Sequence, residues 1–267
     1  TGCAMFKNEL NIQRNRLIEE IGRSAGDIDP FALITKSYAD YPLPVKANID
    51  FARRREATMK QRSFIAKAHP EMLIEFEDIL GGTFQVDNEE KLRFIPRGTR
   101  TRLSMDESSS SVRSLLDLGL YLVCVANPGD LLIIDEPELN LHPKNQRRVA
   151  RLLARVANAG VRVLITTHSD YVVKELNLLL LMNSDDERVR HIAEQERYHR
   201  HETLHGSAIR VYVAKQDVVK KQGKQRRSIG RTLTEVPVTV AKGIEISSFD
   251  QEINDMNRIE DRLIYGE

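Results

Sequence analysis

An apolar run of the sequence ends abruptly in adjacent carboxylates. Residues 131–138 read Leu-Leu-Ile-Ile-Asp-Glu-Pro-Glu, so that Asp135 and Glu136 follow four aliphatic side chains. Two charges at the end of a buried strand are costly unless a cation or hydrogen bonds compensate them, which makes the pair a candidate functional site. Asp135 could hold Mg²⁺, directly or through water, and Glu136 could polarise an attacking water. Alternatively, both carboxylates cap the following turn and face solvent.

A histidine follows the next apolar run in the same manner. Residues 164–170 read Leu-Ile-Thr-Thr-His-Ser-Asp, and His168 stands just after the predicted strand. If the two strands are neighbours, His168 comes near Glu136, where an imidazole could contact a γ-phosphate or the water beside it. A lone histidine after a strand is usually a satisfied structural residue. The acid pair on the preceding strand favours the functional interpretation here.

Four consecutive serines form a third candidate. Glu107 is followed by Ser108, Ser109, Ser110 and Ser111, and a mostly apolar helix is predicted at 112–125. Serine hydroxyls and free backbone N–H groups at a helix N-terminus form an anion site, which the helix dipole reinforces. The alternatives are a helix N-cap with more serines than capping requires and a flexible serine loop.

The elements that position these residues form a strand–helix–strand unit. We expect a buried strand at 131–134, a helix that begins near Pro143 and ends near Gly160, and a second buried strand at 161–166. This order is the βαβ unit of a parallel sheet, whose strand ends display polar chemistry. The predicted fold class is therefore α/β.

The flanking sequence predicts further elements around this unit. They are an amphipathic helix at 5–23, a charged helical arm at 45–68 closed by Pro70, a hairpin of strands 83–86 and 91–95, antiparallel strands at 209–214 and 232–240, and a charged helix at 249–265. We accordingly divide the chain into a helical arm at 1–80, a catalytic lobe at 81–183 and an appendage of hairpin and helix at 184–267.

Composition limits the classes of partner. The 267 residues are 41% hydrophobic and carry 40 Lys and Arg against 39 Asp and Glu, so the chain can bury a core and its bulk charge indicates neither nucleic acid nor membrane. A local basic run between Lys220 and Arg231 could contact nucleic acid or an acidic partner, or be a solvated hairpin tip. No apolar run approaches the ~20 residues of a membrane helix.

Cysteine and histidine usage points to a reducing compartment without a zinc site. The two cysteines, Cys3 and Cys124, are far apart, and no signal-peptide pattern opens the sequence, so we expect a cytoplasmic protein. The spacing of the histidines in the C-terminal third fits no common zinc pattern; they are His191, His199, His201 and His205.

Taken together, these motifs resemble the ATP-binding-cassette ATPases, in the soluble branch that includes chromosome-maintenance, recombination-repair and overcoming-lysogenization-defect-type proteins. Asp135 and Glu136 are similar to the Walker B aspartate and the catalytic glutamate, and His168 is similar to the switch histidine. Residues 137–143, Pro-Glu-Leu-Asn-Leu-His-Pro, resemble the D-loop of that branch, which makes His142 a nucleotide-binding candidate. The segment 81–182 matches the pattern of defence-associated AAA-family ATPases.

The serine run resembles the signature loop, with a departure. The usual Leu-Ser-Gly-Gly-Gln is absent, and serines stand where the glycines belong, so which serine of 108–111 contacts phosphate stays open. Leu103 and Ser104 offer a competing register.

The resemblance implies ATP and Mg²⁺ as cofactors and a P-loop NTPase fold of which this chain holds the C-terminal lobe. In the family, two heads close over ATP, which implies a homodimer with composite sites and an ATP-driven switch. By analogy, the switch would be an anti-phage sensor that controls a separate effector protein. The alternatives are a recombination-repair ATPase that binds DNA and a scaffold that binds ATP without hydrolysing it.

The phosphate-binding loop of such ATPases is missing from the sequence. No Gly-x-x-x-x-Gly-Lys-Ser/Thr occurs, and the pair Gly223 and Lys224 is followed by Gln225. We expect the chain alone to be inactive. The simplest interpretation is the C-terminal part of a head whose first lobe is absent, and the alternative is a degenerate homologue that does not hydrolyse ATP.

Overall fold

The computed structural model describes residue 49 and residues 55–89, 91–220, 227–239, 243–244 and 247–265. The helix predicted at 5–23 lies outside these residues. The described residues fall into two compact units, one built from those of 1–68 and 80–125 and the other from 69–79 and 126–267. The division into an arm, a catalytic lobe and an appendage stays a prediction.

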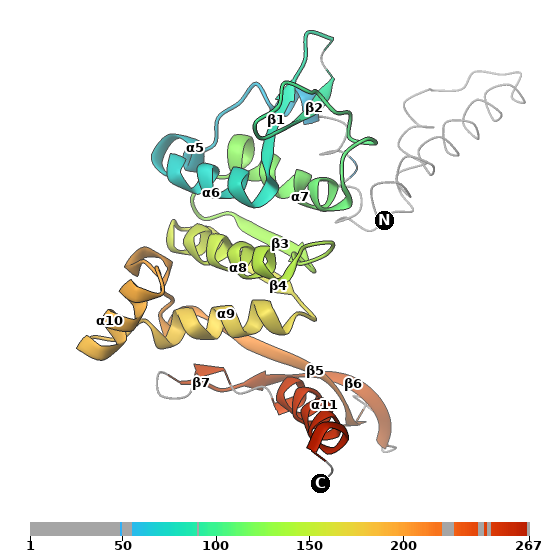
Figure 1. The fold of residues 1–267 in the computed structure, drawn as a ribbon, viewed down its shortest axis with the longest axis vertical. Helices are drawn as coiled ribbons and strands as arrows, with labels where there is room; N and C mark the ends of the chain where they lie inside the picture. Colours follow the sequence, from blue (N-terminus) through green and yellow to red (C-terminus); the bar gives the residue numbers. More distant parts are fainter. Residues whose placement is uncertain are drawn as a thin grey trace, which may run out of the picture. The chain divides into compact units, whose positions relative to one another are not determined.

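The described residues of the first unit include a β-hairpin and several helices. Strands β1 (Gly82–Val86) and β2 (Leu92–Pro96) pair antiparallel, which confirms the predicted hairpin. The other elements of the unit are α4 (Arg55–Thr58), α5 (Phe64–Ala68) and α7 (Ser110–Leu120) (Figure 1). Gly82 is required at its position because a Cβ there would collide with the Phe94 ring and the backbone oxygen of Ile95.

The predicted helix at 112–125 is confirmed, but its last turn is π-helical. Residues Tyr121–Val125 adopt this wider turn, which is frequent at functional or packed sites. The buried residue Ser63 lies against it: its hydroxyl donates to the carbonyl of Leu122 at 2.5 Å, and its N–H donates to the carbonyl of Val123 at 3.0 Å. The π-turn therefore anchors the start of α5.

The second unit contains the predicted strand–helix–strand. Strands β3 (Leu131–Asp135) and β4 (Arg162–Thr166) pair in parallel, and α8 (Pro143–Asn158) connects them, which confirms the α/β class. Pro143 occupies the first turn of α8, where its missing N–H is harmless. Gly160, with a φ of 101°, turns the chain into β4. Figure 1 shows α8 beside these strands, followed by α9 (Asp170–Leu181).

The prediction that both strands are buried is wrong. Alternate side chains of β3 and β4 are exposed, and the aliphatic ones are Leu131 at 54%, Ile133 at 63% and Leu164 at 53%. These residues share one face, since side chains alternate along a strand and Ile133 is paired with Leu164. The intervening side chains are partly buried. Within the described residues, the sheet thus has one covered face and one exposed face.

Helix α6 (Pro70–Leu80) begins at the proline that follows the helical arm. Helix α5 ends at Ala68, as predicted, and Pro70 also starts a new helix, since proline is tolerated at the first turn. From α8, the largely buried Arg155 forms ion pairs with Glu75 at 2.6 Å and Glu71 at 3.2 Å, and so ties α6 to α8.

A buried polar network and an apolar cluster join α8 and α9. Glu175 of α9, whose side chain is fully buried, pairs with Arg147 at 2.5 Å and with Arg151. The Arg151 guanidinium also lies over the Tyr198 ring. The apolar cluster consists of Ala154, Leu179, Leu180, Tyr198, Leu204 and Ile244. Together these contacts fix the two helices that follow β3 and β4.

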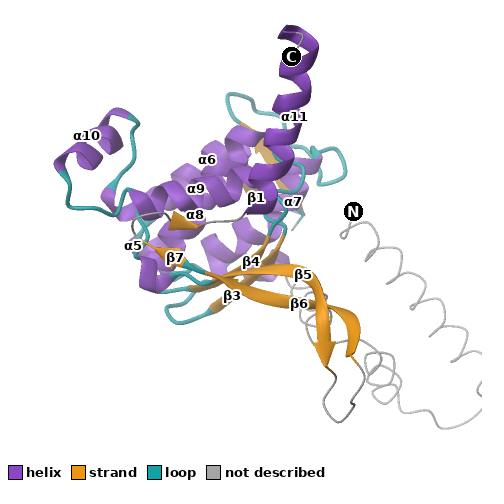
Figure 2. Cartoon of the chain, turned by 90° about the horizontal axis from the view of Figure 1, so that it is seen from below, coloured by secondary structure: helices purple, strands orange, loops and turns teal. Residues whose placement is uncertain are grey.

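The C-terminal part continues with short helices, a long hairpin and a terminal helix. Strands β5 (Val211–Lys220) and β6 (Arg227–Val236) pair antiparallel and confirm the second predicted hairpin, at greater length (Figure 2). The remaining elements are α10 (Glu187–Gln195), the 3-10 turns Arg200–Glu202 and Gly206–Ala208, β7 (Val238–Thr239), β8 (Gly243–Ile244) and α11 (Ser247–Tyr265). Helix α11 confirms the predicted terminal helix. None of the helices among the described residues is long and apolar enough to cross a membrane.

Candidate functional site

The acid pair and the histidine meet at one edge of the sheet. Asp135 is paired in register with Thr166, so both strands end together, and the Glu136 N–H donates to the Thr166 carbonyl at 3.0 Å. The Thr166 hydroxyl donates to the Asp135 carboxylate. His168 Nε2 lies 3.6 Å from Glu136 Oε1, which confirms the predicted approach of these two side chains. The roles assigned to them stay predictions.

The backbone after β3 is bent into two tight turns. Glu136 and Asn140 have positive φ angles of 50° and 61°, which non-glycine residues adopt infrequently. The Leu139 N–H donates to the Glu136 carbonyl at 3.1 Å, and the Leu141 N–H donates to the Glu138 carbonyl at 3.0 Å. Because such conformations cost free energy and cluster at functional sites, the strain at Glu136 supports the site.

Glu138 is a residue of this site that sequence reasoning missed. It is 9% exposed, and its Oε1 accepts hydrogen bonds from the Thr167 hydroxyl at 2.7 Å and from the His168 N–H at 2.9 Å. Its second oxygen, Oε2, is buried and has no hydrogen-bond partner among the described residues. The sequence showed a third carboxylate near the pair, but no local signal revealed what it binds.

A second missed link joins the same two loops through α8. The Ser169 hydroxyl donates to the Gln146 side-chain oxygen at 2.5 Å, and the Gln146 amide donates to the Leu141 carbonyl at 2.9 Å. Ser169 also caps α9 by accepting from the Val172 N–H at 3.2 Å. A serine before a helix is a recognisable capping signal, so the place of Ser169 was predictable even though its contact with Gln146 was not.

A surface hollow of about 440 Å³ adjoins these loops. Its lining includes Glu136, Glu138 and His168 from the two strand ends. The His168 side chain is 89% exposed and that of Glu136 is 32% exposed, so both can reach a bound molecule. His142 is not among the lining residues; its Nδ1 accepts from the Lys144 N–H at 3.3 Å and caps α8. The structure thus gives His142 a capping contact.

The four serines lie in the first unit, at the start of α7. Ser108 is buried, and its hydroxyl donates to the Ser104 carbonyl at 2.8 Å. Ser109 caps α7 by accepting from the Val112 N–H at 3.3 Å, and its oxygen lies 2.8 Å from that of Ser111. Ser109 and Ser110 are exposed and Ser111 is partly exposed. The accessible hydroxyls therefore belong to these last three serines.

The competing register at Ser104 has its own hydrogen bonds. The Ser104 N–H donates to a Glu107 carboxylate oxygen at 2.8 Å, and the Glu107 N–H donates to the Ser104 hydroxyl at 3.3 Å. These contacts, with the backbone one first, hold the pKa of Glu107 below its usual value. The reciprocal pair closes the loop that precedes the serines and occupies the Ser104 side chain.

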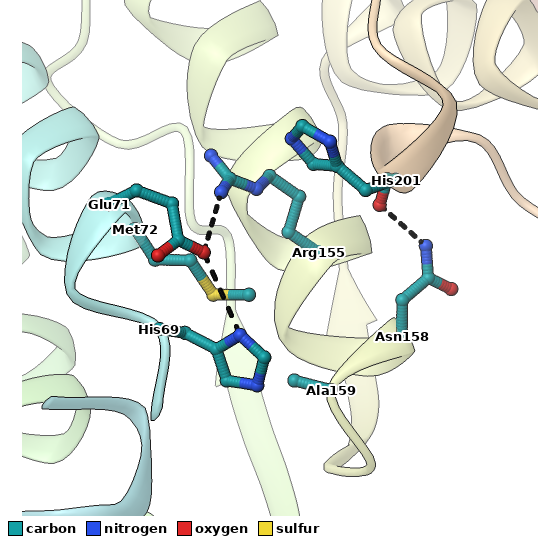
Figure 3. Close-up of a pocket in the computed structure, with 7 residues that line it drawn as sticks. All are labelled: His69, Glu71, Met72, Arg155, Asn158, Ala159 and His201. Atoms are coloured by element: carbon teal, nitrogen blue, oxygen red, sulfur yellow. Dashed lines mark hydrogen bonds and ion pairs between the residues drawn. The ribbon is translucent and has the colours of Figure 1, made fainter. Parts of the chain in front are cut away.

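A second hollow of about 380 Å³ lies between α6, α8 and the histidine-containing loop (Figure 3). Arg155 on its wall is held by Glu71, which also lies 3.6 Å from His69 Nδ1. The Asn158 amide donates to the His201 carbonyl at 3.0 Å. The described residues hold no group of three or more His, Cys, Asp or Glu side chains that could bind a metal. The polar groups of this hollow thus bind one another, which favours a structural role.

Most of the basic run is divided between the strands of the long hairpin and a segment that the structure does not describe. Lys220 ends β5, and β6 begins at Arg227 and includes Arg231. The Arg231 side chain is exposed. Residues 221–226 lie outside the described residues, so the predicted contact with nucleic acid stays a prediction.

Comparison with known proteins places this chain in a family. A family model described as "AAA domain, putative AbiEii toxin, Type IV TA system" matches residues 13–174, which is more than half of the chain. The matched range includes the serine run, the acid pair and His168.

Curated relatives match over shorter stretches. The ABC multidrug transporter SNQ2 of Candida glabrata is 27% identical over 156 residues, which are 53% of this chain and 10% of the transporter. The cytochrome c biogenesis ATP-binding export protein CcmA of Rickettsia typhi is 30% identical over 73 residues, which are 27% of this chain and 36% of that protein. The chain therefore spans about a tenth and about a third of these two relatives.

Two solved structures are similar in part. One, described under ATP-driven dimerization and DNA-stimulated activation of SMC ATPases, is 14% identical and covers 78% of this chain and 95% of its own, with a TM-score of 0.37. The other, described as an SmcHead bound to the C-winged helix domain of ScpA, is 19% identical and covers 49% of this chain and 39% of its own, with a TM-score of 0.34. Both overlaps are loose, and the family assignment rests on the sequence match.

Proposed function

The chain belongs to the AAA-domain family of putative AbiEii toxins of type IV toxin–antitoxin systems, and on that premise we propose that it forms the catalytic half of an ATP-hydrolysing head. The observation that carries the proposal is the approach of His168 Nε2 to Glu136 Oε1 at 3.6 Å, beside Asp135, at the common end of two parallel strands. This is the edge where parallel sheets bind ligands.

Each side chain has a proposed role in phosphoryl transfer. Glu136 accepts a hydrogen bond from the attacking water and aligns it with the γ-phosphate, because catalysis of this reaction consists largely of positioning and electrostatic stabilisation. His168 donates a hydrogen bond to the γ-phosphate or to that water. Its 89% exposed side chain leaves the ring accessible for this contact. His142 caps α8, and its role as a nucleotide-binding residue stays a prediction.

Asp135 fits the binding of Mg²⁺. Its carboxylate is exposed at the strand end, and a carboxylate oxygen is the hard ligand that Mg²⁺ prefers. Mg²⁺ commonly binds through one or two carboxylates together with substrate phosphates, which requires no larger cluster of protein ligands. When bound, the ion would neutralise charge on the phosphates. The Thr166 hydroxyl, which donates to Asp135, would keep this carboxylate oriented.

The serines at the start of α7 would act on ATP held by a second copy. Ser109, Ser110 and Ser111 present hydroxyls and first-turn N–H groups at a helix N-terminus, where a negative charge is favoured. The proposed homodimer therefore has composite sites, each with the acid pair and His168 from one copy and the serines from the other. Ser108 would support the loop from within.

The phosphate-binding loop would come from outside these 267 residues. The exposed face of β3 and β4 offers a surface for the lobe that carries it, because Leu131, Ile133 and Leu164 lie on the same face as Asp135. Because these three side chains are 53–63% exposed, covering the rest of their surface is favourable by roughly 1–2 kcal/mol each. A lobe on this face would lie beside the proposed Mg²⁺ ligand.

The wider role that we propose is a cytoplasmic switch in anti-phage defence, in which closing and opening of the heads controls an effector protein. This role rests on analogy with the family. A second candidate, a repair-type ATPase that binds DNA, is favoured by the basic residues of the β5–β6 hairpin, including the exposed Arg231. A DNA-stimulated ATPase rate that weakens with salt would support it. ATP binding without turnover would instead indicate a scaffold.

The test is ATP hydrolysis by a protein in which this chain is joined to its phosphate-binding segment. Glu136→Gln should lower kcat by about 10²-fold or more, the typical contribution of general acid–base catalysis, and should trap ATP-bound dimers that light scattering detects. Glu194→Gln, on the exposed helix α10, is the matched control and should leave kcat at the wild-type value and trap no ATP-bound dimers. Turnover by Glu136→Gln at the wild-type rate would reject the proposal.

A further inference from the structure

We propose that Glu138 is a positioning residue that holds His168 beside Glu136. This inference rests on the proposed ATPase function and deepens it by adding a residue to the same site. Glu138 Oε1 accepts two hydrogen bonds from the loop after β4, from the Thr167 hydroxyl at 2.7 Å and from the His168 N–H at 2.9 Å. The two loops that carry the proposed catalytic groups are therefore directly joined.

Packing does not fix the exposed His168 ring, so the ring is positioned through the backbone of His168. The side chain of His168 is 89% exposed. The His168 ring nitrogen Nε2 lies 3.6 Å from Glu136 Oε1, too far for a strong hydrogen bond. The hydrogen bond from its N–H to Glu138 is shorter and involves a charged acceptor, which makes it one of the stronger kinds. The anchor of His168 is thus the backbone contact with Glu138.

The burial of Glu138 favours a role for this link beyond stability. A carboxylate that is 9% exposed loses most of its hydration, and its Oε2 is buried without a hydrogen-bond partner among the described residues. Burying a charge in this state opposes folding. A loop that needed stability alone would be served by an uncharged side chain, whereas a charged acceptor gives the tighter hold on two donors.

A second link, through the Gln146 side chain, joins the same two loops. Gln146 of α8 accepts from the Ser169 hydroxyl at 2.5 Å and donates to the Leu141 carbonyl at 2.9 Å. Residues on both sides of His168 are therefore bound to the turn that follows Glu136. A shift of this turn, whose backbone is strained at Glu136, would move His168 with it. Glu138 lies two residues after Glu136 and accepts the His168 N–H directly, so it joins the two segments that carry the proposed catalytic groups.

Amide hydrogen exchange of the 267-residue chain, measured by NMR, tests the anchor. Glu138→Ala should speed exchange of the His168 amide by about tenfold or more, as expected for loss of a bond to a charged acceptor. Glu138→Gln, which keeps an acceptor oxygen, should show a much smaller rise. Amides of α8, such as that of Leu152, should be unchanged in both variants. Unchanged exchange of the His168 amide in Glu138→Ala would overturn the proposal.

Kinetics of the protein that includes the phosphate-binding segment test the consequence. Glu138→Ala should lower kcat about tenfold or more while KM for ATP stays within about threefold, because the change affects the alignment of catalytic groups and not ATP binding. Glu138→Gln should restore most of kcat, and Glu194→Ala should have no effect. Equal kcat in Glu138→Ala and wild type would overturn the proposal. If the wild type hydrolyses no ATP, the proposed function fails, and the exchange measurement still decides whether Glu138 holds His168.

Discussion

Replacement of Glu175 by alanine should destabilise the second unit strongly. The Glu175 side chain is fully buried and pairs with Arg147 at 2.5 Å and with Arg151. Removing one partner of a buried pair costs about 3–5 kcal/mol because a buried charge is left uncompensated. The Arg151 side chain is 19% exposed and cannot easily regain water, whereas that of Arg147 is 45% exposed and can. We therefore expect about 3 kcal/mol, the lower end of the range.

Urea unfolding followed by circular dichroism measures this loss, and a thermal scan should show Tm lower by roughly 6–12 °C at 2–4 °C per kcal/mol for a unit of this size. Asp185→Ala is the matched control, because its ion pair with Arg190 at 3.0 Å is exposed and should contribute less than about 1 kcal/mol. A loss of stability in Glu175→Ala no larger than in this control would show that the buried Glu175 pairs contribute no more than an exposed ion pair.

Three further outcomes are expected. The hydrogen bond from Arg93, and after it those from backbone N–H groups, hold the pKa of Asp87 below its usual value. This carboxylate therefore stabilises the β1–β2 hairpin fully above about pH 4, and its contribution is lost as pH falls through the lower native pKa. Amide exchange of the hairpin, measured against pH, should show this loss, and a flat profile would contradict it. Gly82→Ala should destabilise the first unit by about 1–3 kcal/mol in urea unfolding, because the added methyl group meets the Phe94 ring. Burial raises the pKa of the Cys124 thiol, so iodoacetamide should modify this residue slowly until the protein unfolds, and fast labelling in the native state would contradict its burial.

The sequence was sufficient for the elements whose signals are local. Alternating and apolar runs predicted the two hairpins and the strand–helix–strand, and Pro143 marked the start of α8. The approach of His168 to Glu136 followed from topology, since the carboxyl ends of adjacent parallel strands meet at one edge. This geometric part of the site was therefore predictable once the strands were correctly placed.

The missed features depend on contacts between segments. The run 131–134 is uniformly apolar, so its sequence could not show that Leu131 and Ile133 lie on a face left exposed in the described structure. The partners of Glu138 depend on the tight turns after β3. The sequence does not reveal these turns, because the residue with positive φ is Glu136 and not a glycine. Pro70 could have been interpreted as a helix start, because proline is tolerated at the first turn as well as after an end.

In the proposed function, the ends of β3 and β4 bind the triphosphate of ATP. This placement is tested by a crystal structure of Glu136→Gln with Mg²⁺ and ATP, determined on the protein that includes the phosphate-binding segment. We expect Mg²⁺ at Asp135, the γ-phosphate next to residue 136 and His168, and Ser109–Ser111 of a second copy on the opposite side. A nucleotide bound with Asp135 and His168 both remote from its phosphates would rule out this site.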